Sequence, residues 1–122
     1  GKYRERAEAA FSLVVGMAAE YPTSFARWLS AANFSLEKVK QLAIVSAPSG
    51  LEAFEFIRFA RSAYRPAAIL AASTFPPPPG APMLLQDRPL KNGKTTAYVC
   101  EGFVCKNPVT SLAELRGLLQ SA

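Results

Sequence analysis

The sequence has no histidine, only two cysteines and no long apolar run. Because histidine is absent, the chain by itself cannot form a Ser–His or Cys–His catalytic pair, which only another domain or subunit could complete. Two cysteines are too few for a structural zinc site, which needs four Cys or His ligands, so we expect no metal and no cofactor. No stretch reaches the roughly 18 apolar residues of a membrane span, so we expect no membrane contact.

Acidic residues are sparse as well, nine in all, and they are mostly isolated on predicted helix surfaces. Glycoside hydrolysis needs two carboxylates flanking a cleft, about 5 to 9.5 Å apart, and no such pair stands out. We therefore predict no catalytic residue in this chain. The low cysteine count and the lack of a visible secretory leader favour a reducing compartment, so we predict a cytoplasmic protein.

Half of the 122 residues are apolar and 19% are charged, which is enough apolar material for a packed core. The net charge of +5 could favour an anionic partner, but most basic residues are scattered along the chain. Only Arg58, Arg61 and Arg65 share a helical stripe. Without the stacking aromatics of a nucleic-acid module, we interpret this stripe as a solvated helix face and expect no nucleic-acid partner.

The first 34 residues have helical periodicity. Apolar side chains recur at three- and four-residue steps over residues 3 to 20, which predicts an amphipathic helix. Pro22 suits the first turn of a second helix that reaches about residue 33. The short link makes the two helices an αα-hairpin, which buries too little surface to be stable alone. Since the chain opens on Gly1 with a helix at once, we expect a piece of a longer protein.

Residues 35 to 122 predict a small α/β domain. Short apolar runs at 41 to 46 and 67 to 72 indicate buried strands, and a helix between them makes a βαβ unit with parallel strands. Residues 95 to 100 have the composition of a third strand. The expected fold class is therefore α/β, a helical hairpin followed by a small, mostly parallel three-stranded sheet flanked by helices.

Local signals mark the ends of these elements. Ser49 with Glu52, and Ser111 with Glu114, have the S-x-x-E spacing of a capping box before a helix. The proline-rich segment 73 to 94 contains a stiff stretch at 76 to 82 that cannot join a sheet ladder, and it ends near a tight turn at Asn92-Gly93. Residues 83 to 85 are apolar and could anchor this segment on the core.

Cys100 and Cys105 enclose four residues. In an extended chain their alpha carbons would be about 16 Å apart, whereas a disulfide needs about 4.4 to 6.8 Å. They can bond only if the chain reverses between them, and Gly102 permits this. Two interpretations remain open: a redox pair or a metal contact shared with another domain, or two small apolar side chains or a structural clip beside a turn.

The segment containing Ser46, Ser49 and Gly50 joins a predicted strand to a helix N-terminus. Backbone N–H groups and the helix dipole at such a junction can hold a phosphate or carboxylate, so these residues are a candidate anion site. The chain has neither the G-x-G-x-x-G nor the Walker pattern, and an ordinary helix start explains the same residues.

A specific pattern covers residues 93 to 119, and weaker matches precede it in the order Tyr21-Pro22 with Phe25, residues 42 to 45, and Tyr64-Arg65-Pro66. Its matching elements are Ala97-Tyr98-Val99-Cys100, Phe103, Cys105, Pro108-Val109-Thr110 and Glu114-Leu115. This pattern resembles the C-terminal signature of thioredoxin-domain proteins of the bacterial YyaL type, which are related to the spermatogenesis-associated thioredoxin-like proteins of animals. One departure is Ser46, since the family pattern usually has Gly there, which disfavours close ligand approach at this turn.

The resemblance implies a longer protein, with a thioredoxin-like domain, then an α/α toroid similar to six-hairpin glycosidases, then this segment. The hairpin would end the toroid, and the family's thioredoxin-type cysteines and any sugar-binding cleft would lie outside this chain. We therefore expect a C-terminal structural or interaction domain without activity of its own. It would pack on the remainder of its own chain and self-associate through an exposed apolar face. The alternatives are a redox accessory domain that uses Cys100 and Cys105, and a non-catalytic fragment of a carbohydrate-processing enzyme.

Overall fold

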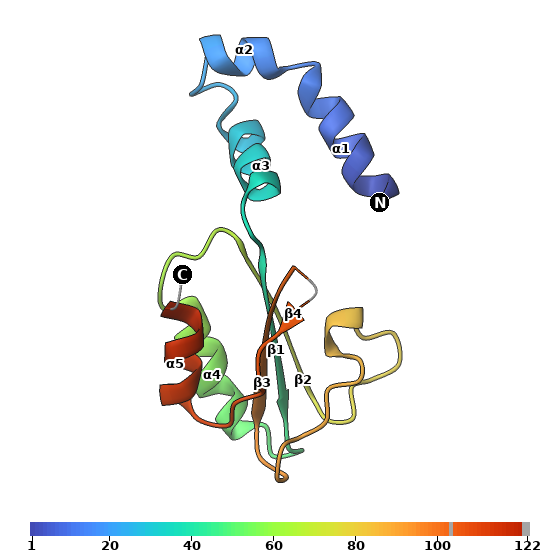
Figure 1. Cartoon of the computed structure of the whole chain (residues 1–122), viewed down its shortest axis with the longest axis vertical. Helices are drawn as coiled ribbons and strands as arrows, with labels where there is room; N and C mark the ends of the chain where they lie inside the picture. Colours follow the sequence, from blue (N-terminus) through green and yellow to red (C-terminus); the bar gives the residue numbers. More distant parts are fainter. Residues whose placement is uncertain (103, 121–122) are drawn as a thin grey trace. The chain divides into compact units, whose positions relative to one another are not determined.

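The computed structural model describes residues 1–102 and 104–120. The chain divides into two compact units, Gly1–Glu37 and Lys38–Ala122 (Figure 1). This division falls three residues after the boundary that the sequence predicted between residues 34 and 35. That predicted boundary lies inside the helix Ala26–Leu36. No helix in the described ranges has the length and apolarity of a membrane span, and the longest helices have 11 residues.

The first unit contains three helices, α1 (Lys2–Ser12), α2 (Val15–Glu20) and α3 (Ala26–Leu36), where the sequence predicted two. The prediction of one continuous helix over residues 3 to 20 is wrong, because α1 ends at Ser12 and α2 begins only at Val15. Val14, Val15 and Gly16 follow one another there, and all three have a lower helix propensity than alanine. The second predicted helix begins late, at Ala26, because residues 21 to 25 form a turn.

The second unit contains a four-stranded sheet of β1 (Lys40–Ser46), β2 (Ala68–Thr74), β3 (Thr96–Glu101) and β4 (Val104–Cys105) in the order β2-β1-β3-β4. The parallel β1–β2 pair confirms the predicted βαβ unit and the α/β class. The expectation of a mostly parallel, three-stranded sheet is wrong, because β3 is antiparallel to both β1 and β4.

The connection between β2 and β3 explains this orientation. Parallel neighbours require the chain to cross back to the edge of the sheet where the previous strand began. Here β2 ends beside the carboxyl end of β1, and β3 starts at that same end, where Thr96 pairs with Val45. The segment between them leaves and re-enters the sheet at this same end and contains only the short 3-10 helix η1 (Met83–Leu85), so β3 runs the opposite way.

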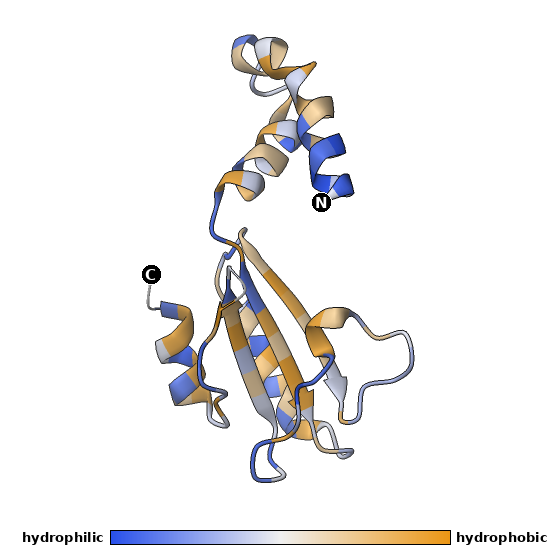
Figure 2. Ribbon diagram, turned by 45° about the vertical axis from the view of Figure 1, so that its right-hand side comes forward, coloured by the Kyte–Doolittle hydropathy of each residue, from blue (hydrophilic) through white to orange (hydrophobic). Residues whose placement is uncertain are grey.

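Each face of the sheet has its own cover (Figure 1). Helices α4 (Leu51–Arg61) and α5 (Leu112–Gln120) cover one face, and η1 with its flanking segment covers the other. The helical side holds the larger core, made of Leu42, Ile44, Ala53, Phe56, Ala97, Val99, Val109 and Leu115. Figure 2 shows the hydrophobic residues concentrated along the central strands. Residues 42 to 46 of β1 are buried as predicted, whereas β2 is only half-buried because it is an edge strand.

Capping and turns follow the local signals in part. Ser111 donates its hydroxyl to Glu114 at 2.9 Å, and the Glu114 N–H donates back to Ser111 Oγ at 3.3 Å, which confirms that capping box. The predicted capping box of Ser49 and Glu52 is wrong. Gly50 is the N-cap residue, at φ 64°, and α4 has no side-chain cap hydrogen bond. Asn92 and Gly93 form the predicted turn, both at positive φ.

The prolines at 76 to 82 stay outside the sheet ladder, as predicted, whereas residues 73 and 74 belong to β2. It is anchored on the core through Leu85, which is 3% exposed, while Met83 is 84% exposed.

Candidate disulfide site

The β3–β4 hairpin brings the two cysteines together. Gly102, at φ 54°, lies in the reversal after β3, and β4 returns so that Cys105 stands opposite Cys100. Their alpha carbons are 3.9 Å apart, closer than the usual range of about 4.4 to 6.8 Å, and their sulfurs form a disulfide. Lys106 donates its N–H to the Val99 carbonyl at 2.9 Å, so the cysteines occupy the neighbouring non-hydrogen-bonded pair, where side chains approach most closely. The reversal that the sequence required for bonding is therefore present.

The two sulfur-bearing residues differ in exposure. Cys100 is 3% exposed because β3 lies between β1 and β4 in the sheet. Cys105 is exposed because β4 is an edge strand of only two residues. Cys105 is therefore the more accessible of the two residues.

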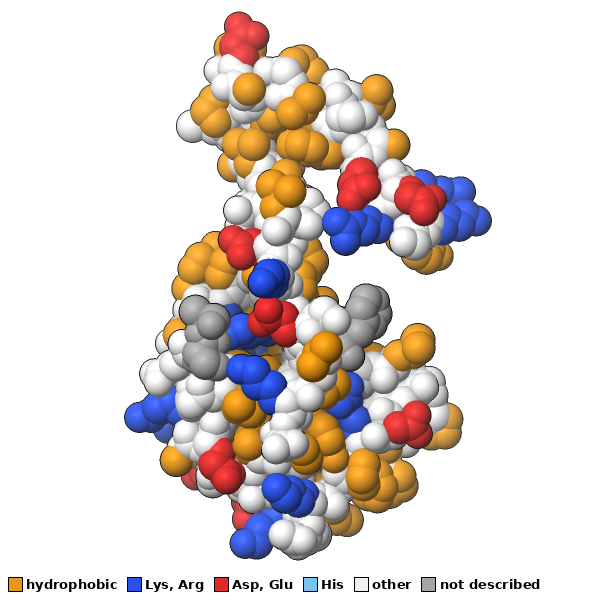
Figure 3. Space-filling model, viewed as in Figure 1, with side chains coloured by type: hydrophobic (Ala, Val, Ile, Leu, Met, Phe, Trp, Pro, Cys, Tyr) orange, Lys and Arg blue, Asp and Glu red, His pale blue; other side chains and the backbone are white. Residues whose placement is uncertain are grey.

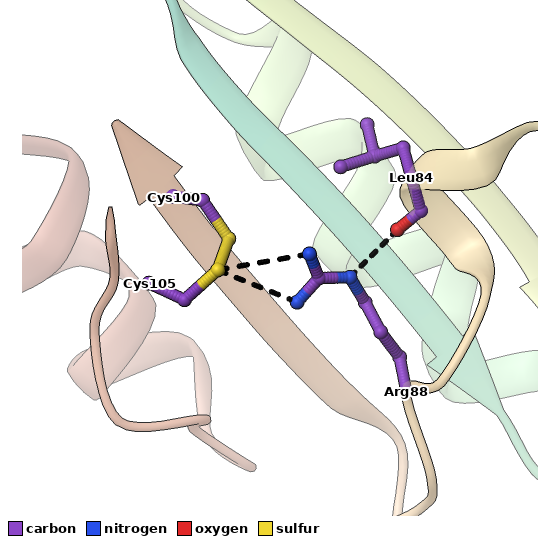
Figure 4. The surroundings of a disulfide bond; sticks show 4 residues. All are labelled: Leu84, Arg88, Cys100 and Cys105. Carbon is purple, nitrogen blue, oxygen red and sulfur yellow. Dashed lines mark hydrogen bonds between the residues drawn. A yellow bond between two sulfur atoms is a disulfide. The ribbon is translucent and has the colours of Figure 1, made fainter. Parts of the chain in front are cut away.

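Arg88 lies directly against the disulfide (Figure 4). Its Nη1 and Nη2 atoms are 3.7 and 3.6 Å from Cys105 Sγ, and its Nε donates to the Leu84 carbonyl at 2.7 Å. The guanidinium also stands over the Tyr98 ring, 5.0 Å from its centroid. Among the described residues, no carboxylate forms an ion pair with Arg88. Its positive charge therefore faces the sulfur without a neutralising partner.

Tyr98 provides the surface on which Arg88 stacks. Its hydroxyl donates to the Pro89 carbonyl at 2.6 Å, which fixes the ring against the segment after η1. Burial raises the pKa of Tyr98, and the nearby Arg88 charge opposes that effect only in part. The phenol therefore stays protonated at neutral pH and keeps donating.

The sequence did not single out Arg88 or Tyr98 as site residues. Tyr98 carried a usable signal, since it lies two positions before Cys100 in a strand and so shares its face. Arg88 carried none, because 17 residues separate it from Cys105 and the segment between has no regular pattern.

The candidate anion residues lie at the carboxyl end of β1. Ser46 is 2% exposed, and its carbonyl accepts the Phe75 N–H at 2.8 Å. Gly50 donates its N–H to the Ala47 carbonyl at 2.9 Å, so that donor is already used. Glu52 adds a negative charge in the first turn of α4, which opposes an anion there. The anion site stays a prediction, without support from these contacts.

Other features of the second unit are less suited to chemistry. Arg58 and Arg61 are exposed on α4, but the helix ends at Arg61, so Arg65 does not share the predicted stripe. Arg65 folds back on α4, donating to the Ala60 carbonyl at 2.9 Å and standing over Phe59. Within residues 1–102 and 104–120, no group of three Cys, Asp or Glu side chains is placed to hold a metal ion.

No family model, no curated protein and no solved structure matches this chain. The resemblance to the YyaL-type proteins therefore stays an expectation, and Phe103, one of its matching residues, lies outside the described ranges.

Proposed function

We propose that this chain is a non-catalytic interaction domain of a longer, cytoplasmic thioredoxin-like protein, and that its helical unit packs against helices of the same protein. The observation that carries the proposal is the exposure of the first unit. Among residues 1 to 37, Ala18 alone is buried. A unit with so little core needs an additional surface to become stable.

The apolar surface of the first unit is large for a free protein. Figure 3 shows hydrophobic side chains exposed over this unit. Those at least 36% exposed are Tyr3, Leu13, Val15, Met17, Tyr21, Trp28, Leu29, Phe34 and Leu36. Covering such a side chain fully contributes about 1.5 to 3 kcal/mol, so a partner that covers several of them would bind favourably.

A groove between α1 and α3 fits a helix. It encloses about 420 Å³ and is lined mainly by apolar side chains, with Phe11, Val15 and Trp28 as the large ones. Four alanines in its walls leave room for close helix approach. The Arg4–Glu8 ion pair, at 2.7 Å, supplies a polar rim. An amphipathic helix with apolar residues at i, i+3, i+4 and i+7 is the partner of matching shape.

The preceding helical domain that the resemblance implies would supply such helices, so we propose it as the occupant. In its absence a second copy of the chain would cover the same groove, which predicts self-association. The carbohydrate-processing alternative differs only in the activity of the remainder of the protein, where its catalytic residues would lie.

Trp28 makes this proposal testable, since it is the only tryptophan and it lines the groove. We expect the 122-residue chain to self-associate as its concentration rises, with a blue shift of Trp28 emission. Ala31→Glu places a carboxylate in the groove and should return the chain to a monomer in sedimentation velocity. Met83→Glu adds the same charge at an 84% exposed position of the second unit and should leave self-association unchanged.

Two outcomes would contradict the proposal. One is a wild-type chain that stays monomeric at high concentration and binds no hydrophobic dye. The other is an equal effect of Ala31→Glu and Met83→Glu. In the longer polypeptide, Trp28 emission should already be blue-shifted and independent of concentration.

A further inference from the structure

We propose that the Cys100–Cys105 disulfide is a thiol–disulfide exchange site, at which a dithiol partner attacks Cys105 and Arg88 stabilises the Cys105 thiolate. This role goes beyond the interaction function and does not depend on it. It rests on three observations: the unequal exposure of the two cysteines, the position of Arg88, and the small loop that the disulfide closes.

Unequal exposure assigns the roles of the two sulfurs. Exchange proceeds by attack of a thiolate on one sulfur of a disulfide, so the accessible sulfur accepts the attack and the other leaves. Cys105 is exposed on the edge strand, whereas Cys100 is 3% exposed. Cys105 is therefore the attacked sulfur and, in the reduced state, the nucleophile. Cys100 is the leaving and resolving sulfur.

Arg88 is placed to favour the thiolate form of Cys105. Both of its Nη atoms lie within 3.7 Å of Cys105 Sγ. The hydrogen bond to Leu84 and the stacking on Tyr98 hold the guanidinium in position, so little side-chain freedom is lost when it engages a thiolate. A cation beside a cysteine stabilises the thiolate, which is the reactive form.

The charged groups around Cys105 do not cancel this effect. Tyr98, on the same face, stays protonated at neutral pH because burial raises its pKa. Glu101 and Lys106 flank the cysteines in sequence, so strand alternation directs them to the opposite face. There they line a cavity of about 370 Å³, to which Cys100 also contributes and in which Lys38 and Lys40 add further positive charge. Asp87 precedes Arg88 but forms no ion pair with it in the described ranges.

The small loop argues against a purely structural clip. The chain-entropy contribution of a disulfide grows with the length of the loop it closes, and these cysteines are only five positions apart. The adjacent strand pairing already brings them face to face. The bond therefore constrains the unfolded chain less than a disulfide that closes a long loop, and we expect it to open without loss of the fold.

The exchange balances with a protein dithiol as reductant. A partner thiolate attacks Cys105 Sγ, the S–S bond breaks, and its electron pair leaves on Cys100 Sγ, which takes a proton from water. The partner's second thiolate then attacks the partner sulfur of the mixed disulfide and releases Cys105 as a thiolate beside Arg88. The disulfide of this chain gains two electrons, and the partner dithiol becomes a disulfide.

The first test measures which cysteine reacts. The reduced chain is treated with limiting iodoacetamide at neutral pH, and peptide mass spectrometry gives the alkylation rate at each cysteine. We expect Cys105 to react about tenfold faster than Cys100, because thiolate reactivity follows accessibility and nearby charge. Arg88→Met should slow Cys105 about fivefold, the effect of one partly exposed cation, and Arg88→Lys should recover part of the rate.

Arg116→Met is the matched control. Arg116 stands over the Phe59 ring at 5.4 Å, much as Arg88 stands over Tyr98, but it contacts neither cysteine. This variant should leave both alkylation rates unchanged. Equal alkylation of the two cysteines, or equal effects of Arg88→Met and Arg116→Met, would overturn the proposal.

The second test measures exchange itself in the folded chain. Cys100→Ser should form a mixed disulfide with oxidised glutathione at Cys105, whereas Cys105→Ser should leave Cys100 unmodified. In glutathione redox buffers, Arg88→Met should make the disulfide harder to reduce, by about fivefold in the equilibrium constant, because the reduced form loses its cation. A disulfide that stays closed in dithiothreitol until the chain unfolds would show a structural clip and end the proposal.

Discussion

The two units of this chain have similar proportions of apolar residues but use them in opposite ways. In the second unit, both faces of β1 are covered, and Ile44 and Val45 are completely buried. In the first unit the helices leave side chains such as Leu13 and Leu36 more than 80% exposed. The difference shows that apolar content alone does not make a core, because short helices need a neighbouring layer to close on.

The largest expected contrast concerns core truncation. Ile44→Ala should lower the free energy of unfolding by about 3 kcal/mol, because it leaves a cavity between two covered layers. Leu36→Ala, at an 86% exposed position of α3, should change it by at most about 0.5 kcal/mol. Urea unfolding followed by circular dichroism measures both, and similar losses would mean that the two units do not differ in packing.

A smaller effect is expected from opening the disulfide. Reduction should lower the free energy of unfolding of the second unit by about 2 kcal/mol, near the low end for disulfides, because the loop is short. The fold should persist, as judged by the near-ultraviolet circular dichroism of Tyr98 and its neighbours. The double variant Cys100→Ala with Cys105→Ala should match the reduced wild type. Global unfolding on reduction would show that the hairpin depends on the bond.

The smallest effect should come from the start of α5. Ser111→Ala removes the capping hydroxyl and should lower the free energy of unfolding by about 1 kcal/mol. A Ser35→Ala control in α3, where the hydroxyl only returns to the Ala32 carbonyl, should have a smaller effect. Equal losses would mean that the capping box contributes nothing specific.

The same box predicts a pH dependence. Hydrogen bonds from the Ser111 side chain and the Thr110 backbone lower the pKa of Glu114. A carboxyl whose pKa is lower in the folded state stabilises the fold above its unfolded pKa, and this contribution is lost as the pH falls through the folded value. The stability difference between wild type and Ser111→Ala should therefore narrow in acid. A difference that is constant with pH would contradict this account.

Local sequence signals predicted several parts of the fold correctly. The βαβ unit, the Asn92-Gly93 turn and the Ser111 capping box each depend on residues close together in the chain. The errors have physical causes of their own. Helix periodicity did not reveal the break before Val15, and Gly50 replaced Ser49 at the start of α4 because a positive φ is easy for glycine.

The candidate disulfide site also combines a feature that the local sequence predicts with one that it does not. The sequence stated the condition for a Cys100–Cys105 bond, a reversal at Gly102, because chain geometry over six residues is nearly independent of the rest of the fold. It said nothing of Arg88, whose position depends on how the proline-rich segment returns across the sheet.

By itself, then, the sequence determined the α/β class, the chain reversal that a disulfide would need and the absence of histidine chemistry, since these follow from composition and short-range geometry. Only the tertiary structure decided the antiparallel placement of β3, the exposure of Cys105 and its contact with Arg88. Those features arise from packing between segments far apart in the chain, and no local pattern encodes which surfaces will meet.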